Sequence, residues 1–322
     1  MGLAPQRPSR VMWAEGKPQE ISIQELLQKI PSGDVLVVNN TKVLKRRVFV
    51  NDLEILFLTQ QSPSEWEVLF PSKKYALGSE IDLPLGVKMK LLKKGRPQLV
   101  HLSEVLSESY FDEIAELPLP PYIQKARGER HNQFADSDWY QTAWATKGGS
   151  LAAPTASLHF SQLDLQTLKS RGVEVVELTL HVGLGTFLPV TTENLNEHPM
   201  HEEYVQIPAQ TWAKIEKARS NRNGIWAMGT TVARSLESAA LGLLIKSSEG
   251  SFEGFTRLLI QPGYQWQVVN RLLTNFHQPE STLLALVAGF SNLNKVKECY
   301  AWAIENEFRL FSYGDLTAWV RD

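Results

Sequence analysis

Apolar positions near the start of the chain predict one compact αβ unit between residues 11 and 47. In "SIQELLQKI" the apolar residues Ile23, Leu26, Leu27 and Ile30 recur at helical spacing, and Ser22 precedes them as a plausible N-cap. "VMW" before this helix and "VLVVNN" after it are apolar runs of strand length.

The pattern changes to short alternating strands between residues 48 and 125. Five segments alternate apolar and polar positions, with turn residues between them: "LEILFLTQ", "EWEVLF", "SEIDLP", "VKMKLLKK" and "QLVHLSEV". This spacing is typical of a small antiparallel sheet or barrel. The prolines of "LPLPPYIQ" end the region because they do not fit a central strand.

Helices and strands alternate from about residue 150 to the end. Strands are predicted at "VEVVELTLHV", "GIWAM", "TRLLI" and "RLLTNF", and helices at "SQLDLQTLKSRG", "PAQTWAKIEKARSN", "TTVARSLESAALG", "STLLALVAGF" and "NKVKECYAWAIENEF". Such alternation favours an α/β fold with a mainly parallel sheet. We therefore expect a mainly parallel α/β core formed by residues 1–47 and 126–322, with a small antiparallel β-barrel domain inserted at 48–125.

Composition indicates a soluble protein. Of the 322 residues, 43% are hydrophobic and 21% charged, and the formal charge is −2. Cys299 is the one cysteine, which excludes an intrachain disulfide and a cysteine-rich metal or iron–sulfur site, and its helical spacing suggests core packing. Neither a membrane span nor a secretory signal is apparent, so we expect a cytoplasmic protein with no membrane association.

The segment "ELTLHVGLGTF" begins like a dinucleotide-binding turn. Gly183 and Gly185 follow a strand, but a third glycine is missing and Pro189 argues against a helix there. The segment therefore predicts either a plain turn or a loop in which the backbone approaches a ligand closely, with His181 before it and Thr186 after it.

Several other strand ends carry polar residues, which is where α/β sheets bind ligands. "LAAPTASLHF" contains a Pro-Thr turn followed by a histidine, and "AMGTTVARSLES" is a strand, a Gly-Thr-Thr turn and a helix start suited to an anion. "TNFHQPEST" and "FSYGDL" bring further polar groups. The candidate binding residues are Pro154, Thr155, Gly183, Gly185, Thr186, Thr230, Thr231, Arg234, Asn275, His277, Tyr313 and Asp315. Taken singly, each has a structural explanation, such as a capped helix with a surface Arg234–Glu237 pair.

"EHPMHEEY" contains His198, His201, Glu202 and Glu203. Its spacing is not the His-Glu-x-x-His pattern of zinc hydrolases, and Pro199 argues against a helix that presents both imidazoles, so we expect no metal site.

Basic residues are concentrated between residues 40 and 100, where eleven Lys and Arg face six Asp and Glu. A positive face could track a phosphate backbone, or the lysines could be solvated residues that prevent edge pairing; the sequence leaves both open.

These segments together resemble the S-adenosylmethionine:tRNA ribosyltransferase-isomerase family. "LAAPTASLHF", "LTLHVGLGTFLPV", "MHEEY", "GTTVARSLES", "LLTNFHQPESTLL" and "FRLFSYGD" occur in that family's order, and "VVNNTKV", "LPLPPYI" and "YQTAWA" are similar to its earlier blocks. The resemblance covers roughly residues 3–317. Departures from the family pattern include Asn40, Lys42, Trp139, Ser157 and Gln278.

The resemblance implies an α/β domain with an inserted β-barrel and a role in queuosine biosynthesis. The ribosyl part of S-adenosylmethionine, a co-substrate, would pass to the 7-aminomethyl-7-deazaguanine at the wobble position of tRNA, in the anticodon region. The ribose would become an epoxycyclopentane, with release of adenine and methionine. No prosthetic group is implied.

That chemistry requires a base that removes a proton from the carbon beside the sulfonium. The resulting ylide would expel adenine, and the amine of the tRNA base would attack the opened sugar. His159, His181, His201 and Glu202 are candidates for the base, and the sequence does not rank them. Two alternatives remain: a methyltransferase that uses the same donor, and a non-catalytic tRNA-binding module.

Overall fold

The chain forms two compact units. The computed structural model describes residues 9–183, 185 and 195–321. The large unit comprises Met1–Lys42 with Asp138–Asp322, and the small unit is Val43–Ser137. Thr186 lies outside the described residues.

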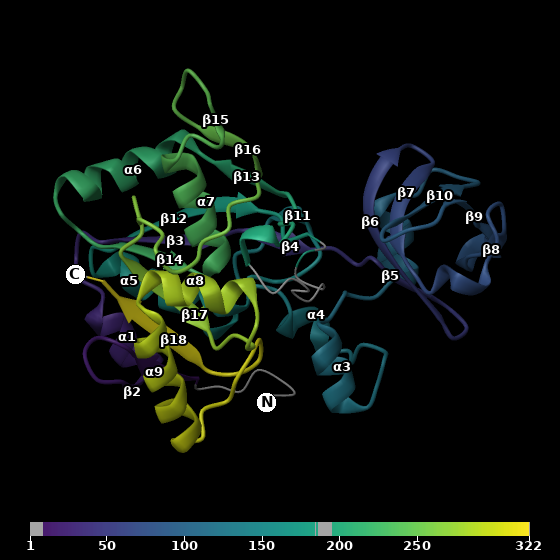
Figure 1. The fold of residues 1–322 in the computed structure, drawn as a ribbon. Coiled ribbons are helices and arrows are strands. Elements are labelled where there is room, and N and C mark those ends of the chain that lie inside the picture. The colour runs from purple at the N-terminus through teal and green to yellow at the C-terminus, as the bar shows by residue number, and fades with distance from the viewer. Residues whose placement is uncertain (1–8, 184, 186–194, 322) are drawn as a thin grey trace. The chain divides into compact units, whose positions relative to one another are not determined.

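The large unit contains one ten-stranded sheet with helices on both faces (Figure 1). Its strands are β1 (Arg10–Trp13), β2 (Gln19–Ser22), β3 (Val35–Asn39), β12 (Glu174–Leu180), β13 (Glu203–Ile207), β14 (Ile225–Met228), β15 (Ile245–Lys246), β16 (Phe252–Thr256), β17 (Arg271–Asn275) and β18 (Leu316–Val320). Its α-helices are α1 (Ile23–Lys29), α5 (Gln162–Ser170), α6 (Ala209–Ser220), α7 (Thr230–Ala240), α8 (Thr282–Phe290) and α9 (Leu293–Glu305). The 3-10 helices η3 (Thr155–His159) and η5 (Leu195–Glu197) and a short ladder of β4 (Thr41–Val43) with β11 (Lys147–Ser150) complete the described elements.

The large sheet is mixed. Its strand order is β15-β16-β13-β12-β3-β14-β17-β18-β1-β2. The central strands β12, β3, β14 and β17 run parallel, as do β18 and β1, whereas the other neighbouring pairs of described strands are antiparallel. The α/β class is confirmed, but the expectation of a mainly parallel sheet holds only for its centre.

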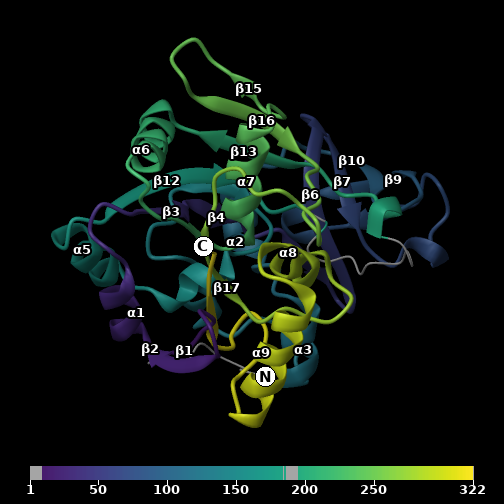
Figure 2. The same cartoon turned by 60° about the vertical axis from the view of Figure 1, so that its left-hand side comes forward.

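Alternating side chains of the buried strands divide the core into two layers. Leu36 and Val38 of β3 pack in one cluster with Leu26 and Leu27 of α1 and with Leu168 of α5. The helices α6 and α7 contact the same central strands from the other face, as Figures 1 and 2 show. Capping boxes begin α1 at Ser22 and α5 at Ser161, as the serine patterns predict.

The small unit is built on a curled antiparallel sheet. Its strands are β5 (Arg47–Val50), β6 (Leu53–Ser62), β7 (Glu65–Leu69), β8 (Glu80–Asp82), β9 (Lys88–Lys93) and β10 (Gln98–Leu102), in the order β5-β6-β7-β10-β9-β8. Phe57, Trp66 and Phe111 meet edge-on or tilted in its core, where α2 (Glu108–Ile114) covers the sheet. The helices α3 (Pro121–Arg127) and α4 (Asp136–Trp139) and two 3-10 turns, η1 (Ser72–Lys74) and η2 (Pro84–Gly86), accompany it. Among the described strands β5 and β8 do not pair, so the ladder is an open sheet.

One predicted strand is wrong. "TRLLI" continues β16 only through Thr256, because the backbone beyond it bonds to side chains: Leu258 N donates to Thr256 Oγ1 and Leu258 O accepts from Arg234 Nε. Cys299 is fully buried, as its spacing predicts. Within the described residues, no helix has the length and apolar character needed to cross a membrane.

Candidate active site at the carboxyl edge of the sheet

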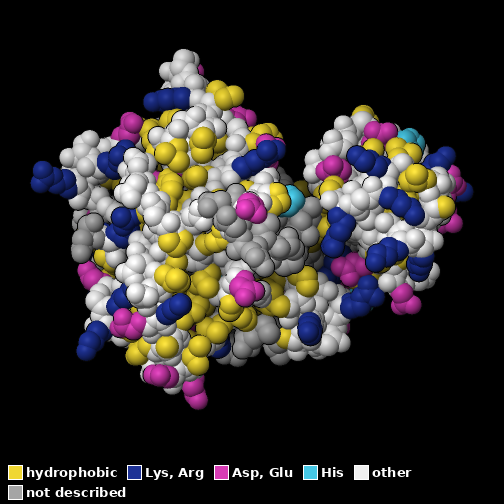
Figure 3. Space-filling view, viewed as in Figure 1, with side chains coloured by type: hydrophobic (Ala, Val, Ile, Leu, Met, Phe, Trp, Pro, Cys, Tyr) yellow, Lys and Arg dark blue, Asp and Glu magenta, His cyan; other side chains and the backbone are white. Residues whose placement is uncertain are grey.

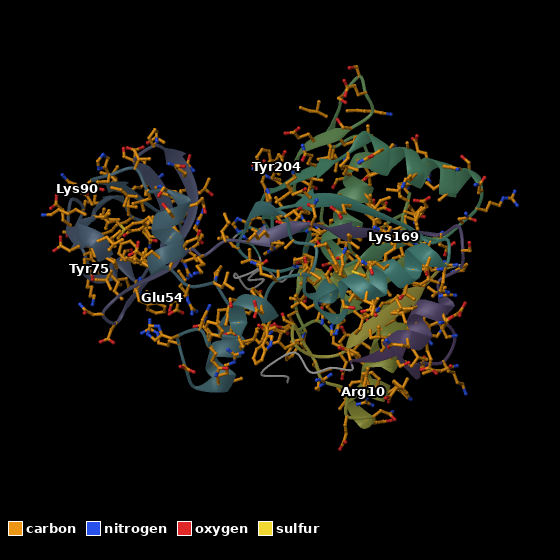
Figure 4. All side chains as sticks on the ribbon, turned by 180° about the vertical axis from the view of Figure 1, so that it is seen from behind. Arg10, Glu54, Tyr75, Lys90, Lys169 and Tyr204 are labelled. Atoms are coloured by element: carbon orange, nitrogen blue, oxygen red, sulfur yellow. The ribbon has the colours of Figure 1, made fainter. Side chains whose placement is uncertain are left out.

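The parallel strands β12, β3, β14 and β17 all end at one edge of the large sheet, here called the carboxyl edge. Because β18 runs antiparallel to β17 and β1 runs parallel to β18, the starts of β18 and β1 lie at the same edge. Tyr204, which faces His181, and Arg10, the first residue of β1, mark its two ends (Figure 4). The predicted polar segments therefore meet along this edge.

His181 follows β12 and is held by one ring nitrogen. Its Nδ1 lies 2.8 Å from Thr41 Oγ1, and its ring stacks on Tyr204 with the centroids 5.5 Å apart. No described residue forms a hydrogen bond with Nε2. Burial lowers the pKa of His181 below its ordinary value, so the imidazole is neutral at physiological pH.

Gly149 lies against the His181 ring. A Cβ at this position would come within 2.6 Å of His181 Nε2, and the backbone φ of +148° also favours glycine. Burial and a hydrogen bond to Glu253 raise the pKa of Tyr204 to about 12, so a neutral phenol supports the ring. Sequence reasoning missed these neighbours because they are distant in the chain.

His159, by contrast, has both ring nitrogens bonded within the protein. Nδ1 lies 2.8 Å from Ser9 Oγ, and Nε2 lies 2.9 Å from the amide nitrogen of Asn275. The same amide nitrogen donates to the carbonyls of Phe311 and Ser312, which fixes the orientation of the amide. Nε2 of His159 must then accept and Nδ1 must carry the hydrogen. His159 is also buried, so it is not an accessible base.

The start of α7 lies beside the η3 turn. The N-cap Gly229 has φ +98°, and a Cβ there would be 3.9 Å from Ala156 Cβ. No side chain caps the helix, so its first N–H groups point out of the helix end. Oγ of Ser157 and Oγ1 of Thr231 are buried and have no partner among the described residues, whereas native buried hydroxyls are usually bonded.

Pro154 and Thr155 lead into this turn and Thr230 opens the helix; Pro154 and Thr230 are buried and Thr155 is half-buried. The three residues therefore lie where the sequence placed them, between the Pro-Thr turn and the helix start. Oδ1 of Asn275, at the end of β17, is another buried acceptor with no partner in the described part of the chain. These unpaired polar atoms are those that a bound polar ligand would satisfy.

Arg234 of α7 forms a buried ion pair with Glu203 of β13, and not the surface pair with Glu237 that the helix spacing suggested. The other carboxylate oxygen of Glu203 accepts from Gly183 N at 3.3 Å, so this pair also holds the start of the glycine loop. Glu203 was not a predicted site residue. Glu203 alternates with Val205 and Ile207 on the inward face of β13, and this alternation is the sequence signal that its side chain is buried.

His201 and Glu202 differ from Glu203 in being exposed. Glu202 pairs at the surface with Arg257 at 3.0 Å, and a Cβ on Gly185 would lie 3.3 Å from His201. A pocket of about 580 Å³ opens here, lined by His198, Pro199, Met200, His201, Arg257, Leu259 and Gln261. At Gly185 the close neighbour is therefore the His201 side chain, and the expected approach of the loop to a ligand stays a prediction.

The remaining predicted residues, His277, Tyr313 and Asp315, bond or pack with other parts of the protein and so stabilise the carboxyl edge. His277 bonds Thr274 Oγ1 at 2.8 Å, its backbone N–H donates to Tyr300 Oη, and burial lowers its pKa to about 4. Tyr313 is buried edge-on against Tyr140.

Asp315 is fully buried, pairs with Arg309 and accepts from Arg10 N. Its carboxylate joins the starts of β18 and β1. Among the described residues, no three His, Cys, Asp or Glu side chains group as metal ligands.

Comparison with known proteins identifies the family. A family model described as "Queuosine biosynthesis protein" matches residues 2–318. Proteins named S-adenosylmethionine:tRNA ribosyltransferase-isomerase from Natranaerobius thermophilus and Sulfurihydrogenibium sp. are 38% and 37% identical, over 92% and 91% of this chain and 87% and 86% of their own lengths.

A solved structure shows the same similarity at the level of the fold. The S-adenosylmethionine tRNA ribosyltransferase of Thermotoga maritima matches with a TM-score of 0.55 at 26% identity, over 99% of this chain and 95% of that one. The motif order, the whole-chain family match and these relatives agree. The chain therefore belongs to the queuosine biosynthesis protein family of S-adenosylmethionine:tRNA ribosyltransferase-isomerases.

Proposed function

We propose that this enzyme transfers and isomerises the ribosyl moiety of S-adenosylmethionine onto the 7-aminomethyl-7-deazaguanine at the tRNA wobble position. The products are epoxyqueuosine-tRNA, adenine and methionine. The relatives' shared name supports the reaction class. The observation that carries the assignment to the carboxyl edge is a neutral histidine with an open nitrogen on the same edge as unpaired buried acceptors.

His181 is the base in this proposal. When the Thr41 hydroxyl donates to Lys147 O, which lies 3.5 Å away, its oxygen accepts the hydrogen of His181 Nδ1. The lone pair is then on Nε2, the nitrogen that has no partner among the described residues. This atom removes the proton beside the sulfonium, the ylide expels adenine, and the amine of the tRNA base attacks the opened sugar. The bond between carbon and the sulfonium sulfur then breaks, so that methionine leaves as the epoxide closes.

His159 is a positioning residue in this scheme. Its hydrogen bonds tie the η3 turn to β17 through Asn275 and to the start of the chain through Ser9. The helix end at Thr230 and Thr231 binds the methionine carboxylate of the donor, because free N–H groups and the helix dipole favour an anion.

Two strand spacings separate the ends of β12 and β14, and three separate β12 from β17, which amounts to about 10 Å and about 14 Å along the edge. The proposed base and the proposed carboxylate site therefore lie at different points along one extended ligand. His201 and Glu202, in the exposed pocket, are the alternative bases.

The test measures adenine release and exchange of the donor hydrogen beside sulfur, using tRNA that bears the 7-deazaguanine precursor. His181→Ala is expected to abolish exchange and release. His201→Ala is expected to exchange normally. His159→Asn is expected to lower donor affinity more than the exchange rate of bound donor. Normal exchange in His181→Ala would assign the base elsewhere.

The same assay separates the alternatives. A methyltransferase produces S-adenosylhomocysteine and no free adenine, and a tRNA-binding module turns over no donor.

We expect kcat/KM to be constant through neutral pH and to fall only below pH 6.5, because burial lowers the pKa of His181 and only its neutral form accepts a proton.

A basic surface on the small unit supports binding of the tRNA backbone. Where β9 turns into β10, five exposed cations lie close to Gln98, whose amide donates to Phe70 O and Ser72 Oγ and so joins the η1 loop to this turn. Within the described residues none of the five forms an ion pair. We call this surface the lysine-rich end: Lys73, Lys74, Lys93, Lys94 and Arg96. Tyr75, labelled in Figure 4, lies beside it.

A further inference from the structure

A second pocket lies at the opposite edge of the large sheet. It has a volume of about 340 Å³, and three separate segments line it: the end of α6 with the residues after it, the segment before β17, and the residue after β18. Arg321 N donates to Asn270 O and Ile225 N donates to Asn270 Oδ1, which places the pocket where β14 and β17 begin. It is therefore separate from the carboxyl edge.

Three arginines line this pocket, and none of the described residues that line it is an Asp or Glu. The lining residues are Arg219, Arg222, Asn223, Trp266, Gln267, Val268, Val269, Asn270 and Arg321. Arg271, next to the pocket, adds a fourth guanidinium, which donates to the carbonyls of Asn270 and Arg321. Two buried acids lie beside the lining segments, and both are occupied. Glu237 accepts from the N–H groups of residues 267–269 and from Tyr264 Oη, and Asp34 accepts from Gly224 N and Trp226 Nε1.

The three guanidiniums are not neutralised within the described chain. The Arg219 side chain donates only to Gln267 O, the Arg222 side chain makes no hydrogen bond or ion pair with a described residue, and Nη1 of Arg321 is buried without a partner beside the Phe290 ring. Elsewhere eight arginines have carboxylate partners: Arg10, Arg46, Arg47, Arg127, Arg130, Arg234, Arg257 and Arg309. Arg219 and Arg222 are exposed, so solvent screens part of the repulsion among the three charges, and an anion bound among them is favoured.

We propose that this pocket binds the phosphate group of a nucleotide, either free or within RNA. Guanidinium forks match phosphate oxygens in pairs, and the N–H groups of residues 267–269 are already used, so the arginines are the donors. Trp266 also lines the pocket and is half-buried, with its indole N–H bonded to Gly289 O and its ring roughly perpendicular to those of Tyr264 and Phe290. The part of the ring that lines the pocket is the aromatic group nearest the arginines for contact with a base. The volume is of the size that small-ligand pockets have.

The test compares Arg222→Asn combined with Arg321→Gln against Lys217→Gln, an exposed charge change on the same helix, α6. Asparagine suits position 222 because φ there is +60°. The melting temperature is measured with inorganic phosphate and with guanosine monophosphate at constant ionic strength in chloride. Wild type and Lys217→Gln should be stabilised by both anions, and the double variant by neither. The melting temperature without ligand reports whether the double variant is folded.

A second arm identifies the source of the phosphate. If the pocket holds RNA, the double variant binds unmodified tRNA more weakly, and its salt slope is smaller by up to about 2. If it holds a free nucleotide, tRNA binding is unchanged. The proposal is overturned if wild type does not respond to phosphate or if the double variant responds as wild type does. Adenine release by wild type tests the carboxyl edge independently.

Discussion

At the scale of single residues, one glycine controls the space around the proposed base. A Cβ at Gly149 would meet Nε2, Cδ2 and Cε1 of His181 at 2.6–2.7 Å, closer than any real contact. We expect Gly149→Ala to displace the ring and to lower the rate of donor exchange at least tenfold, because displacing a reacting group by about 1 Å can cost about 100-fold.

Gly263→Ala is the matched control for this variant. Gly263 also has a positive φ, +96°, but a Cβ there meets nothing within 4 Å. Gly263→Ala therefore introduces backbone strain without a contact to His181, so the rate of donor exchange in this variant should stay near that of wild type. Equal losses in both variants would mean that strain, and not the histidine, is responsible.

The second residue-scale prediction concerns His277. Its folded pKa of about 4 lies below the ordinary value of 6.5, so the unfolded chain binds more protons between these pH values. Stability from this group is therefore complete above pH 6.5 and declines as pH falls toward 4, by up to about 1.4 kcal/mol per pH unit.

His277→Gln keeps a partner for Thr274 and removes the titration. Urea unfolding at pH 7.0 and pH 5.0 measures the effect. The variant should lose less stability than wild type over this interval, and an equal loss in both proteins would assign the pH dependence to other groups, such as His181.

Residue types and chain position predicted most of the candidate site, but not its contacts. His181 and Thr231 follow strands, and Asn275 ends a strand, that the sequence pattern already locates. Their partners were not predictable, since Thr41 is 140 residues from His181 and Asn275 is 116 from His159. Only the packed sheet brings these segments together, and it also removes His159 from the list of accessible bases.

At the scale of elements, the Glu203–Arg234 ion pair joins strand β13 to helix α7. Both side chains are buried, so removing one partner leaves an uncompensated charge. We expect Glu203→Gln to lower the free energy of unfolding by about 3–5 kcal/mol, measured by urea denaturation.

A double variant distinguishes the ion pair from general damage to β13. Glu203→Gln combined with Arg234→Met removes both charges and should recover much of the loss, which a double-mutant cycle quantifies. Additive losses would show that the two side chains act independently.

Element types were predictable where apolar periodicity is long, as in α6, α7, α9 and β12. The strands β2, β13 and β18 were missed or hidden within motifs, although β3, β14 and β17 are equally short and were predicted. The predicted strands are nearly continuous apolar runs, whereas β2 has a single buried position and β13 begins inside a charged segment. Strand direction was less predictable still. Local pattern gives no sign that β18 inserts antiparallel beside β17 and then pairs parallel with β1 from the other end of the chain.

At the scale of the whole molecule, the excess of basic residues between residues 40 and 100 does not give the small unit a net positive charge. Val43–Ser137 contains thirteen Lys and Arg and thirteen Asp and Glu, so its formal charge is zero. Figure 3 shows both signs on its visible face. Arg46, Arg47 and Arg127 are consumed in ion pairs with Glu108, Glu116 and Asp136. Within the small unit, we therefore expect the lysine-rich end to make the strongest contact with RNA.

That location gives a matched pair of variants. Lys93 and Lys94 belong to the lysine-rich end and have no ion pair in the described structure. Lys88 and Lys90 of β9 are also exposed, but they lie opposite Asp82 and Glu80 of the neighbouring strand β8. Lys88 Nζ lies 4.0 Å from a carboxylate oxygen of Glu80. A phosphate must compete with these carboxylates at β9 and with none at the turn.

We therefore expect Lys93→Gln with Lys94→Gln to raise the KM for tRNA and to leave kcat unchanged, because the turn contacts the backbone and not the reacting groups. The slope of log affinity against log salt should decrease in magnitude by up to about 2, since each lost phosphate contact releases about one fewer counterion. Lys88→Gln with Lys90→Gln should change both quantities less. If the two pairs behave alike, the small unit attracts tRNA through diffuse charge, and a local binding surface at the lysine-rich end is excluded.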